Sequence, residues 1–112
     1  MDLNDLDNPV YKGYYQHQTD AIDHNLYVWG TTLYQTNYLA GLRILDVKDP
    51  NPSAIKEIGY FDTTPDKTTR EFEGTWSVYP WYSGNKVVLS DIHQGLFVVE
   101  TDLWRSSHWV LN

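Results

Sequence analysis

The sequence predicts an all-β fold, and three observations lead to that prediction. Phe, Trp and Tyr make up 15% of the 112 residues, and aromatic side chains fit the pleated surface of a sheet. Apolar residues occur in short runs separated by Gly, Pro, Asn and Asp, as strands separated by turns do. No segment keeps the i, i+3, i+4, i+7 apolar spacing of an amphipathic helix.

An internal repeat with a period of 54 residues organises the chain. Residues 30–45 align without a gap on residues 84–99, which places Gly41 opposite Gly95. The other matched positions are Gly30 with Gly84, Asn37 with Asp91, and Leu42, Ile44 and Leu45 with Leu96, Val98 and Val99.

The repeat is less regular at its two ends. Upstream of the aligned stretch, Tyr27 falls opposite Trp81, and a shift of two residues is the alternative there. A third, partial copy begins the chain with shorter spacing: Asn8-Pro9 and then Gly13-Tyr14 resemble Asn51-Pro52 and then Gly59-Tyr60.

Each full copy predicts four short strands. They are expected near residues 25–29, 32–38, 42–47 and 55–62, and again near 76–82, 86–92, 96–101 and 108–111. Gly30-Thr31 and Ser83-Gly84-Asn85 supply tight turns, because Gly and Asn tolerate positive φ. Residues 39–41 and 93–95 read as three-residue loops that end in a Gly bulge. Pro50 and Pro52 cannot continue a strand, because proline lacks the N–H donor of a ladder.

The third strand of each copy indicates how the sheets are arranged. Residues 42–45 and 96–99 are apolar on both faces, whereas a strand with one wet face would alternate. Four-stranded antiparallel units stacked face to face are the blades of a β-propeller. We therefore expect about two blades of an incomplete propeller, and missing blades or self-association to cover the remaining faces. A small β-sandwich with accidental internal similarity is the alternative.

A family resemblance agrees with that architecture. Residues 21–30, 33–38 and 41–50, and then 59–63, 76–80, 90–92 and 95–98, resemble the LVIVD-repeat proteins, most of all the choice-of-anchor B group. The resemblance implies a β-propeller in a protein that is secreted or held at the cell surface. Members are longer and carry a signal peptide, so we expect this chain to be a C-terminal fragment of such a parent. Its parts would be the end of a preceding blade (1–20), a first full repeat (21–63) and a second repeat (74–112).

Composition excludes several functions. The formal net charge of −7 disfavours nucleic-acid binding, which needs a basic surface. The chain has no Cys, so it has no disulfide and no cysteine zinc site. No apolar run approaches the length of a membrane-spanning helix. We also find no motif that points to a cofactor or to a metal.

The sharpest polar cluster is Asp23-His24-Asn25, at the start of the first strand of a blade. A carboxylate, an imidazole and an amide there could bind a polar ligand that faces the central channel. The alternative is structural: Asp23 and Asn25 cap or turn the chain, and His24 makes a structural hydrogen bond.

Aromatic residues form the second candidate site. Trp76 and Tyr79 lie in a dense aromatic stretch with Trp81 and Tyr82. Exposed rings could stack on a glycan or anchor a protein partner, and buried rings would pack between blades.

Two further groups of oxygen-bearing side chains have structural explanations. Asn37 and Asp91 share one repeat position, where a hydrogen bond between strands or blades explains both and a Ca²⁺ ligand role is the alternative. Glu71 and Glu73, near Asp62 and Asp66, could form a glycosidase acid–base pair, but a solvated acidic loop explains them as well.

The sequence thus favours a non-enzymatic extracellular repeat module for binding or scaffolding, with no catalytic residues. The alternatives are part of a secreted hydrolase of glycans or peptides, completed by the missing blades, and an accessory domain of a secreted protease. Close approach of Asp23, His24 and Glu73 with raised carboxylate pKa values would favour the enzyme.

Overall fold

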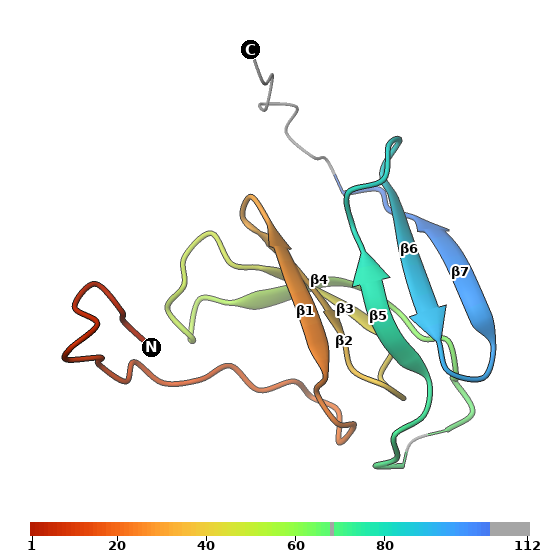
Figure 1. Cartoon of the computed structure of the whole chain (residues 1–112), viewed down its shortest axis with the longest axis horizontal. Coiled ribbons are helices and arrows are strands. Elements are labelled where there is room, and N and C mark those ends of the chain that lie inside the picture. Colours follow the sequence, from red (N-terminus) through yellow and green to blue (C-terminus); the bar gives the residue numbers. More distant parts are fainter. Residues whose placement is uncertain (68, 104–112) are drawn as a thin grey trace.

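The computed structural model describes residues 1–67 and 69–103, and within them the protein is all-β. Seven strands form two antiparallel sheets, and the described part contains no helix (Figure 1). The strands are β1 (Asn25–Trp29), β2 (Thr32–Thr36), β3 (Leu42–Asp46), β4 (Lys56–Phe61), β5 (Thr75–Tyr79), β6 (Lys86–Asp91) and β7 (Gly95–Glu100). The predicted all-β class is confirmed, and the strand expected at 108–111 lies outside the described residues.

Each sheet is a simple up-and-down meander. The first has the strand order β1-β2-β3-β4 and the second β5-β6-β7. The chain leaves the first sheet at β4, on one edge, and enters the second at β5, which contacts β1 and β2 at the other edge (Figure 1). The two first strands therefore lie next to each other, and neither sheet closes on itself.

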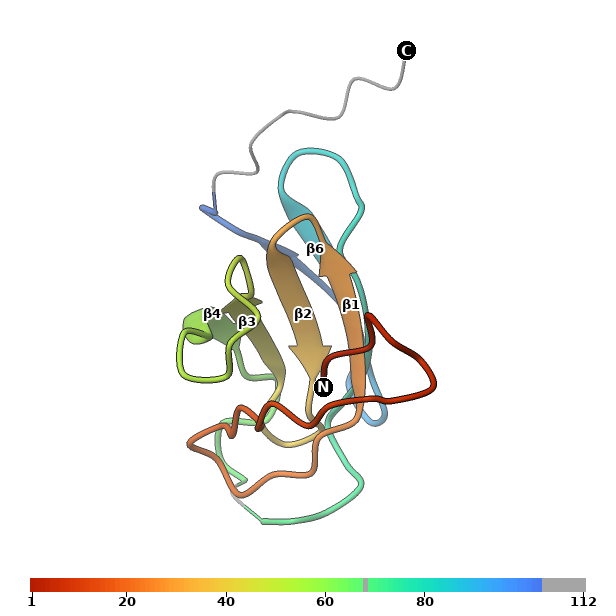
Figure 2. The same ribbon diagram turned by 90° about the vertical axis from the view of Figure 1, so that its left-hand side faces the viewer.

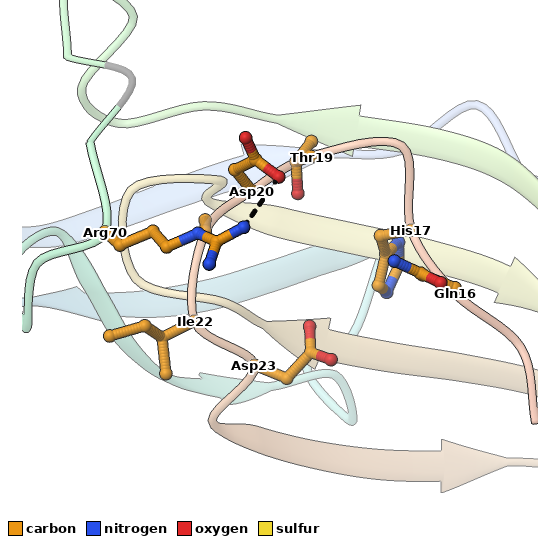
Figure 3. Close-up of a pocket in the computed structure, with 8 residues that line it drawn as sticks. Gln16, His17, Thr19, Asp20, Ile22, Asp23 and Arg70 are labelled. Atoms are coloured by element: carbon orange, nitrogen blue, oxygen red, sulfur yellow. Dashed lines mark hydrogen bonds and ion pairs between the residues drawn. The ribbon is translucent and has the colours of Figure 1, made fainter.

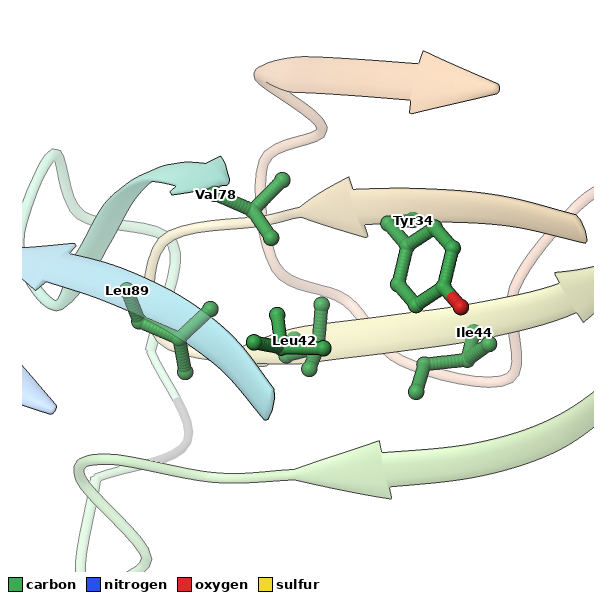
Figure 4. Close-up of a cluster of buried hydrophobic side chains, with 6 residues drawn as sticks. Tyr34, Leu42, Ile44, Val78 and Leu89 are labelled. Atoms are coloured by element: carbon green, nitrogen blue, oxygen red, sulfur yellow. The ribbon is translucent and has the colours of Figure 1, made fainter. Parts of the chain in front are cut away.

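The hydrophobic core lies between the two sheets. Tyr34, Leu42 and Ile44 of the first sheet meet Val78 and Leu89 of the second (Figure 4). All five side chains are at most 4% exposed. At the outer edge the rings of Phe61 on β4 and Phe97 on β7 lie 5.8 Å apart, which extends the contact across the width of the sheets.

The structure resolves the alignment at the start of each sheet. Tyr27 pairs with Tyr34, and Tyr79 pairs with Val88, the repeat equivalent of Tyr34. Tyr27 therefore corresponds to Tyr79, so the two-residue shift is right and the gap-free match to Trp81 is wrong. The chain from Tyr79 to its partner Val88 is two residues longer than the chain from Tyr27 to Tyr34, and Pro80 ends β5 at Tyr79.

The predicted glycine turns are present, but two strands end at least two residues earlier than expected. The strand expected at 76–82 is β5, which ends at Tyr79. Gly41 and Gly95 have φ values of +70° and +82°, as a bulge at the end of each loop requires. The second strand ends at Thr36 rather than at residue 38. Its last predicted residue, Tyr38, has a φ of +46° and forms an isolated bridge with Thr75 of the other sheet.

Residues 1–22 precede the first sheet and cross its outer face, the face away from the second sheet (Figure 2). Their one backbone bridge joins Asp2 to Val10. His17 is 8% exposed, and its Nε2 lies 2.9 Å from Oε1 of Gln35 on β2. Its Nδ1 lies 3.6 Å from a carboxylate oxygen of Glu57 on β4. The segment is thus held to the sheet by polar contacts.

Candidate functional site

The structure brings His24 and Trp76 together at the end of the sheets where β1 and β5 begin. They occupy equivalent repeat positions, each just before the residue aligned with Asn25 or Ser77. The ring centroids of His24 and Trp76 are 4.5 Å apart, and His24 also lies 4.6 Å from the ring of Tyr38. Phe72 completes this group, with its ring 5.4 Å from Tyr38. We call His24, Tyr38, Phe72 and Trp76 the His24 cluster.

Hydrogen bonds fix the imidazole in this cluster. Nδ1 of His24 lies 2.8 Å from the backbone carbonyl of Trp76. A carbonyl oxygen only accepts, so Nδ1 carries a proton. In the neutral ring the lone pair is then on Nε2, where it can accept a hydrogen bond from a ligand. His24 thus makes a structural hydrogen bond, which joins the two sheets, and its Nε2 can still accept a hydrogen bond from a ligand.

Asn25 links the two sheets instead of facing a ligand. Its Nδ2 donates to the hydroxyl of Ser77 across 3.0 Å. Nearby, the buried hydroxyl of Thr36 lies 3.3 Å from the carbonyl of Asn25 and 3.2 Å from that of Trp76. These contacts hold β1 and β5 in place below the His24 cluster.

The cluster presents aromatic surface on a fixed base. Phe72 and Trp76 are 71% and 48% exposed, whereas Tyr38 is 4% exposed. The backbone of Tyr38 exchanges two hydrogen bonds with Thr75, of 3.1 and 3.0 Å. Positive φ in a residue with a bulky side chain costs free energy and is common at binding sites. The strained turn holds the buried ring of Tyr38, and the exposed rings of Phe72 and Trp76 pack against that ring.

Tyr79 lies in a separate aromatic group. Its ring is 5.4 Å from that of Trp81, which in turn is 5.1 Å from that of Tyr27. Tyr79 is 51% exposed and Trp81 40% exposed. The structure therefore divides the predicted aromatic patch, because Trp76 belongs to the His24 cluster and Tyr79 does not.

Asp23 lines a pocket that does not include its neighbour His24. A pocket of about 300 Å³ is lined by Asp23, His17, Asp20 and Arg70, among others (Figure 3). Arg70 and Asp20 form an exposed ion pair of 3.0 Å across its mouth. The three consecutive residues 23–25 thus point to three surroundings and do not form one ligand set.

The acidic residues considered for catalysis do not gather at the His24 cluster. Glu73 pairs with Lys67, and this hydrogen bond lowers the pKa of the Glu73 carboxyl, with a smaller contribution from the charge of His93. The described residues contain no group of three or more His, Asp or Glu side chains that could hold a metal ion. Asp23, His24 and Glu73 therefore lie in different surroundings, and the pKa of Glu73 is lowered instead of raised.

Asp91 is the centre of a buried polar network. Its Oδ2 accepts a 2.6 Å hydrogen bond from the hydroxyl of Thr63, and its Oδ1 accepts from the amides of His93 and Gln94 at 2.9 Å. Burial raises the pKa of Asp91, but these hydrogen bonds outweigh burial and lower it overall. The hydroxyls of Thr63 and Thr75 are 2.9 Å apart, so the network ties the β4–β5 connection to the second sheet. The role of Asp91 is therefore explained by hydrogen bonding, one of the two alternatives for this repeat position; the other was a Ca²⁺ ligand.

Sequence reasoning missed three members of these sites. Phe72, Tyr38 and Thr63 come close to their partners only through the β4–β5 connection and the Tyr38–Thr75 bridge. No repeat signal indicated these three residues. For the contact between His24 and Trp76, the corrected repeat alignment is the one sequence signal that could have indicated it.

Comparison with known proteins adds no relative: no family model, no curated protein and no solved structure matches the chain. The described part of the chain contains no helix that is long and apolar enough to cross a membrane.

Proposed function

We propose that this chain is a non-enzymatic repeat module of a β-propeller, of the LVIVD type, that binds or scaffolds partners as part of a larger secreted or cell-surface protein. The path of the chain supports this reading. It runs from β1 to β4 across one sheet and then returns to the edge where β1 lies to begin the next, as successive blades of a propeller do.

One observation carries the proposal: the two sheets present the same apolar face in the same direction, and one of those faces is uncovered. Leu42 and Ile44 on β3 are 1% and 4% exposed, because the second sheet covers them. Their repeat equivalents on β7, Leu96 and Val98, are 71% and 57% exposed. A further sheet stacked on β7 would bury them in the same way, which is how repeat modules gain stability from their neighbours.

The arrangement of polar residues supports binding over catalysis. The imidazole of His24 packs against two aromatic rings, and Glu73 forms an ion pair with Lys67. A general acid–base pair would need both groups within reach of one substrate atom. In contrast, exposed Phe72 and Trp76 beside a hydrogen-bonding imidazole suit a glycan, whose apolar ring faces stack on aromatic side chains.

A tandem duplication of the chain tests the module reading. If the sheets stack, the second copy covers the Leu96 and Val98 face of the first. The duplicated protein should then unfold in one cooperative transition, at a higher temperature than the single chain. Calorimetry of both proteins checks this. Two independent transitions at the temperature of the single chain would refute stacking.

Binding at the His24 cluster has its own test. Titration with glucose and N-acetylglucosamine oligosaccharides should change tryptophan fluorescence in the wild-type chain. Trp76→Ala should abolish saturable binding, and Tyr79→Ala, in the separate aromatic group, should leave the affinity unchanged. No saturable change with either sugar series, or equal losses in both variants, would exclude a glycan site at this cluster.

A further inference from the structure

The outer face of the first sheet is exposed, whereas the repeat-equivalent face of the second sheet is buried against the first sheet. Leu26 on β1 pairs with Gln35, and Val78 on β5 pairs with the repeat equivalent Leu89. Leu26 is 48% exposed on the outer face, whereas Val78 is 3% exposed against the first sheet. Val28 follows the same pattern: it is 50% exposed, and Pro80, two residues after Val78, is fully buried. The two ends of the molecule therefore carry complementary halves of the contact seen between its sheets.

The second sheet lacks a strand that the first sheet has. Within residues 1–67 and 69–103, β7 pairs with β6 alone, whereas β3 pairs with both β2 and β4. Among the described residues, the backbone N–H and C=O groups of β7 that point away from β6 therefore have no partner strand. Such an edge is a template for another strand.

Residues 10–15 resemble β4, the strand that has no equivalent in the second sheet, but they pair with neither sheet. Val10 to Tyr15 reads VYKGYY, and β4 reads KEIGYF, so that Gly13 and Tyr14 align with Gly59 and Tyr60. Residues 11–15 belong to no strand of the described chain. Tyr11 and Tyr14 are 65% and 71% exposed.

This segment already lies against the outer face of the first sheet. The ring of Tyr15 is 5.1 Å from that of His17, and Nδ1 of His17 is 3.6 Å from the carboxylate of Glu57 on β4. Burial, and then the charge of Glu57, raise the pKa of Tyr15, in agreement with this position. In the other repeat, Phe61 aligns with Tyr15 and contacts Phe97, which aligns with Arg43. Tyr15 thus sits on the first sheet much as Phe61 sits on the second.

We propose that a second copy of this chain docks head to tail on the first. The β7 face of one copy, with Leu96 and Val98, covers the Leu26 and Val28 face of the next. Residues 10–15 of that next copy pair with the free edge of β7 and complete the three-stranded sheet. The proposal rests on the stacking of sheets in the proposed function and adds the partner, its orientation and the strand exchanged.

Such an interface is heterologous, because each copy contributes a different surface. Repeated contacts of this kind close into a ring or grow as a filament, according to the rotation between copies. Each chain carries a formal charge of −7, so the copies repel one another. Added salt screens that repulsion and should strengthen assembly.

Sedimentation velocity over a range of protein concentrations tests the assembly. The wild-type chain should form oligomers that grow with concentration and with salt. Leu96→Glu and Leu26→Glu should each give monomers, whereas Leu6→Glu, an exposed leucine in the N-terminal loop at 78%, should leave assembly unchanged. Circular dichroism should show that all three variants fold.

Mixing the two defective variants separates this proposal from a symmetric one. A Leu96→Glu chain keeps the Leu26 face, and a Leu26→Glu chain keeps the Leu96 face. Their mixture should therefore form a heterodimer and nothing larger. A monomeric wild type, a mixture that stays monomeric, or a Leu26→Glu variant that assembles as well as wild type would overturn the proposal. If the tandem duplication is still stabilised in any of these cases, the proposed function stands without the self-docking.

Strand pairing by residues 10–15 is tested by proline. Successive N–H groups of an extended chain point to opposite sides, so Tyr11 and Tyr14 together place one N–H on the paired side whatever the register. The double variant Tyr11→Pro and Tyr14→Pro should weaken assembly at least tenfold more than Tyr11→Ala and Tyr14→Ala. Removal of residues 104–112 should leave assembly intact. Equal effects of the two double variants, or loss of assembly on that removal, would refute the pairing.

Discussion

Two strands of this protein, β3 and β7, carry aliphatic residues at the same repeat positions and lie in opposite environments. Leu42 and Ile44 are buried in the core of the first sheet, and their equivalents Leu96 and Val98 are among the most exposed apolar side chains of the second. The residue types do not decide which strand is buried. The neighbouring sheet decides it, and the chain supplies that neighbour on one side only within its described residues.

Truncation of the two equivalent leucines measures this difference directly. Leu42→Ala removes a side chain from the packed space between the sheets and should lower the free energy of unfolding by about 2–5 kcal/mol. Leu96→Ala removes a solvent-exposed side chain and should change it by less than about 0.5 kcal/mol. Urea denaturation of both variants gives the comparison.

The measurement is best made in the Leu26→Glu background, in which assembly is blocked. In the assembling chain, Leu96→Ala should become costlier as the protein concentration rises, because binding to the folded state stabilises it. A large loss for Leu96→Ala in the monomeric background would mean that the chain covers this face by itself.

The equivalent loops before β3 and β7 make the second comparison. Gly41 and Gly95 both have positive φ, but a Cβ on Gly41 would lie 2.7 Å from Cα of Asp62 and closer still to the carbonyl of Phe61. A Cβ on Gly95 would meet nothing within 4 Å. Gly95→Ala should therefore cost about 1 kcal/mol for the backbone alone, and Gly41→Ala about 3 kcal/mol because the clash adds to the strain.

Thermal unfolding of Gly41→Ala and Gly95→Ala checks this difference. Gly30→Ala is the matched control, since Gly30 also has positive φ and open space around its Cβ position. Equal losses at Gly41 and Gly95 would show that the end of β4 moves away from the first loop at little cost.

Local sequence features predicted most of the fold, because turns and strands are encoded within a few residues. The positions of Gly30, Gly41, Gly84 and Gly95 and the prolines near residue 50 place the ends of the strands to within three residues. The largest error is at β5, which Pro80 ends at Tyr79 instead of at residue 82. The next largest, at the second strand, came from Tyr38. Its bridge to Thr75 in the other sheet overrides the strand propensity of an aromatic residue.

The candidate site was harder to predict, because its contacts join distant parts of the chain. His24 and Trp76 are 52 residues apart, and their contact follows only from the two-residue shift in the repeat. Phe72 lies in a connection without a repeat equivalent, so no pattern placed it beside Tyr38. Asp23 and Tyr79 looked like members of the site from sequence proximity alone, and the structure places them elsewhere.

Asn37 and Asp91, at one repeat position, show how a shared structural role can use different chemistry. Both are buried, but only Asp91 has a charge. Asn37 accepts a long hydrogen bond of 3.4 Å from the amide of His24, and its Nδ2 has no hydrogen-bond partner among the described residues. Asp91 accepts from Thr63 and from two amides. The second sheet is therefore more dependent on this position, and in a pH-dependent way.

Asp91→Asn should lower the free energy of unfolding by about 2 kcal/mol at neutral pH, because hydrogen bonds to a charged acceptor are replaced by weaker ones. The pKa of Asp91 is lower in the folded protein than its ordinary value of 3.8. Its ionised form thus stabilises the fold fully above the pKa of the unfolded chain, and this contribution is lost as the pH falls through the lower, folded pKa. The difference in the free energy of unfolding between wild type and Asp91→Asn should accordingly be constant near neutral pH and shrink below about pH 4.

Urea denaturation at a series of pH values measures this difference. Asp102→Asn, which removes an exposed carboxylate, is the control for the loss of one charge. A difference that stays constant down to pH values well below 3 would show that the Thr63 and amide contacts do not depend on the charge of Asp91.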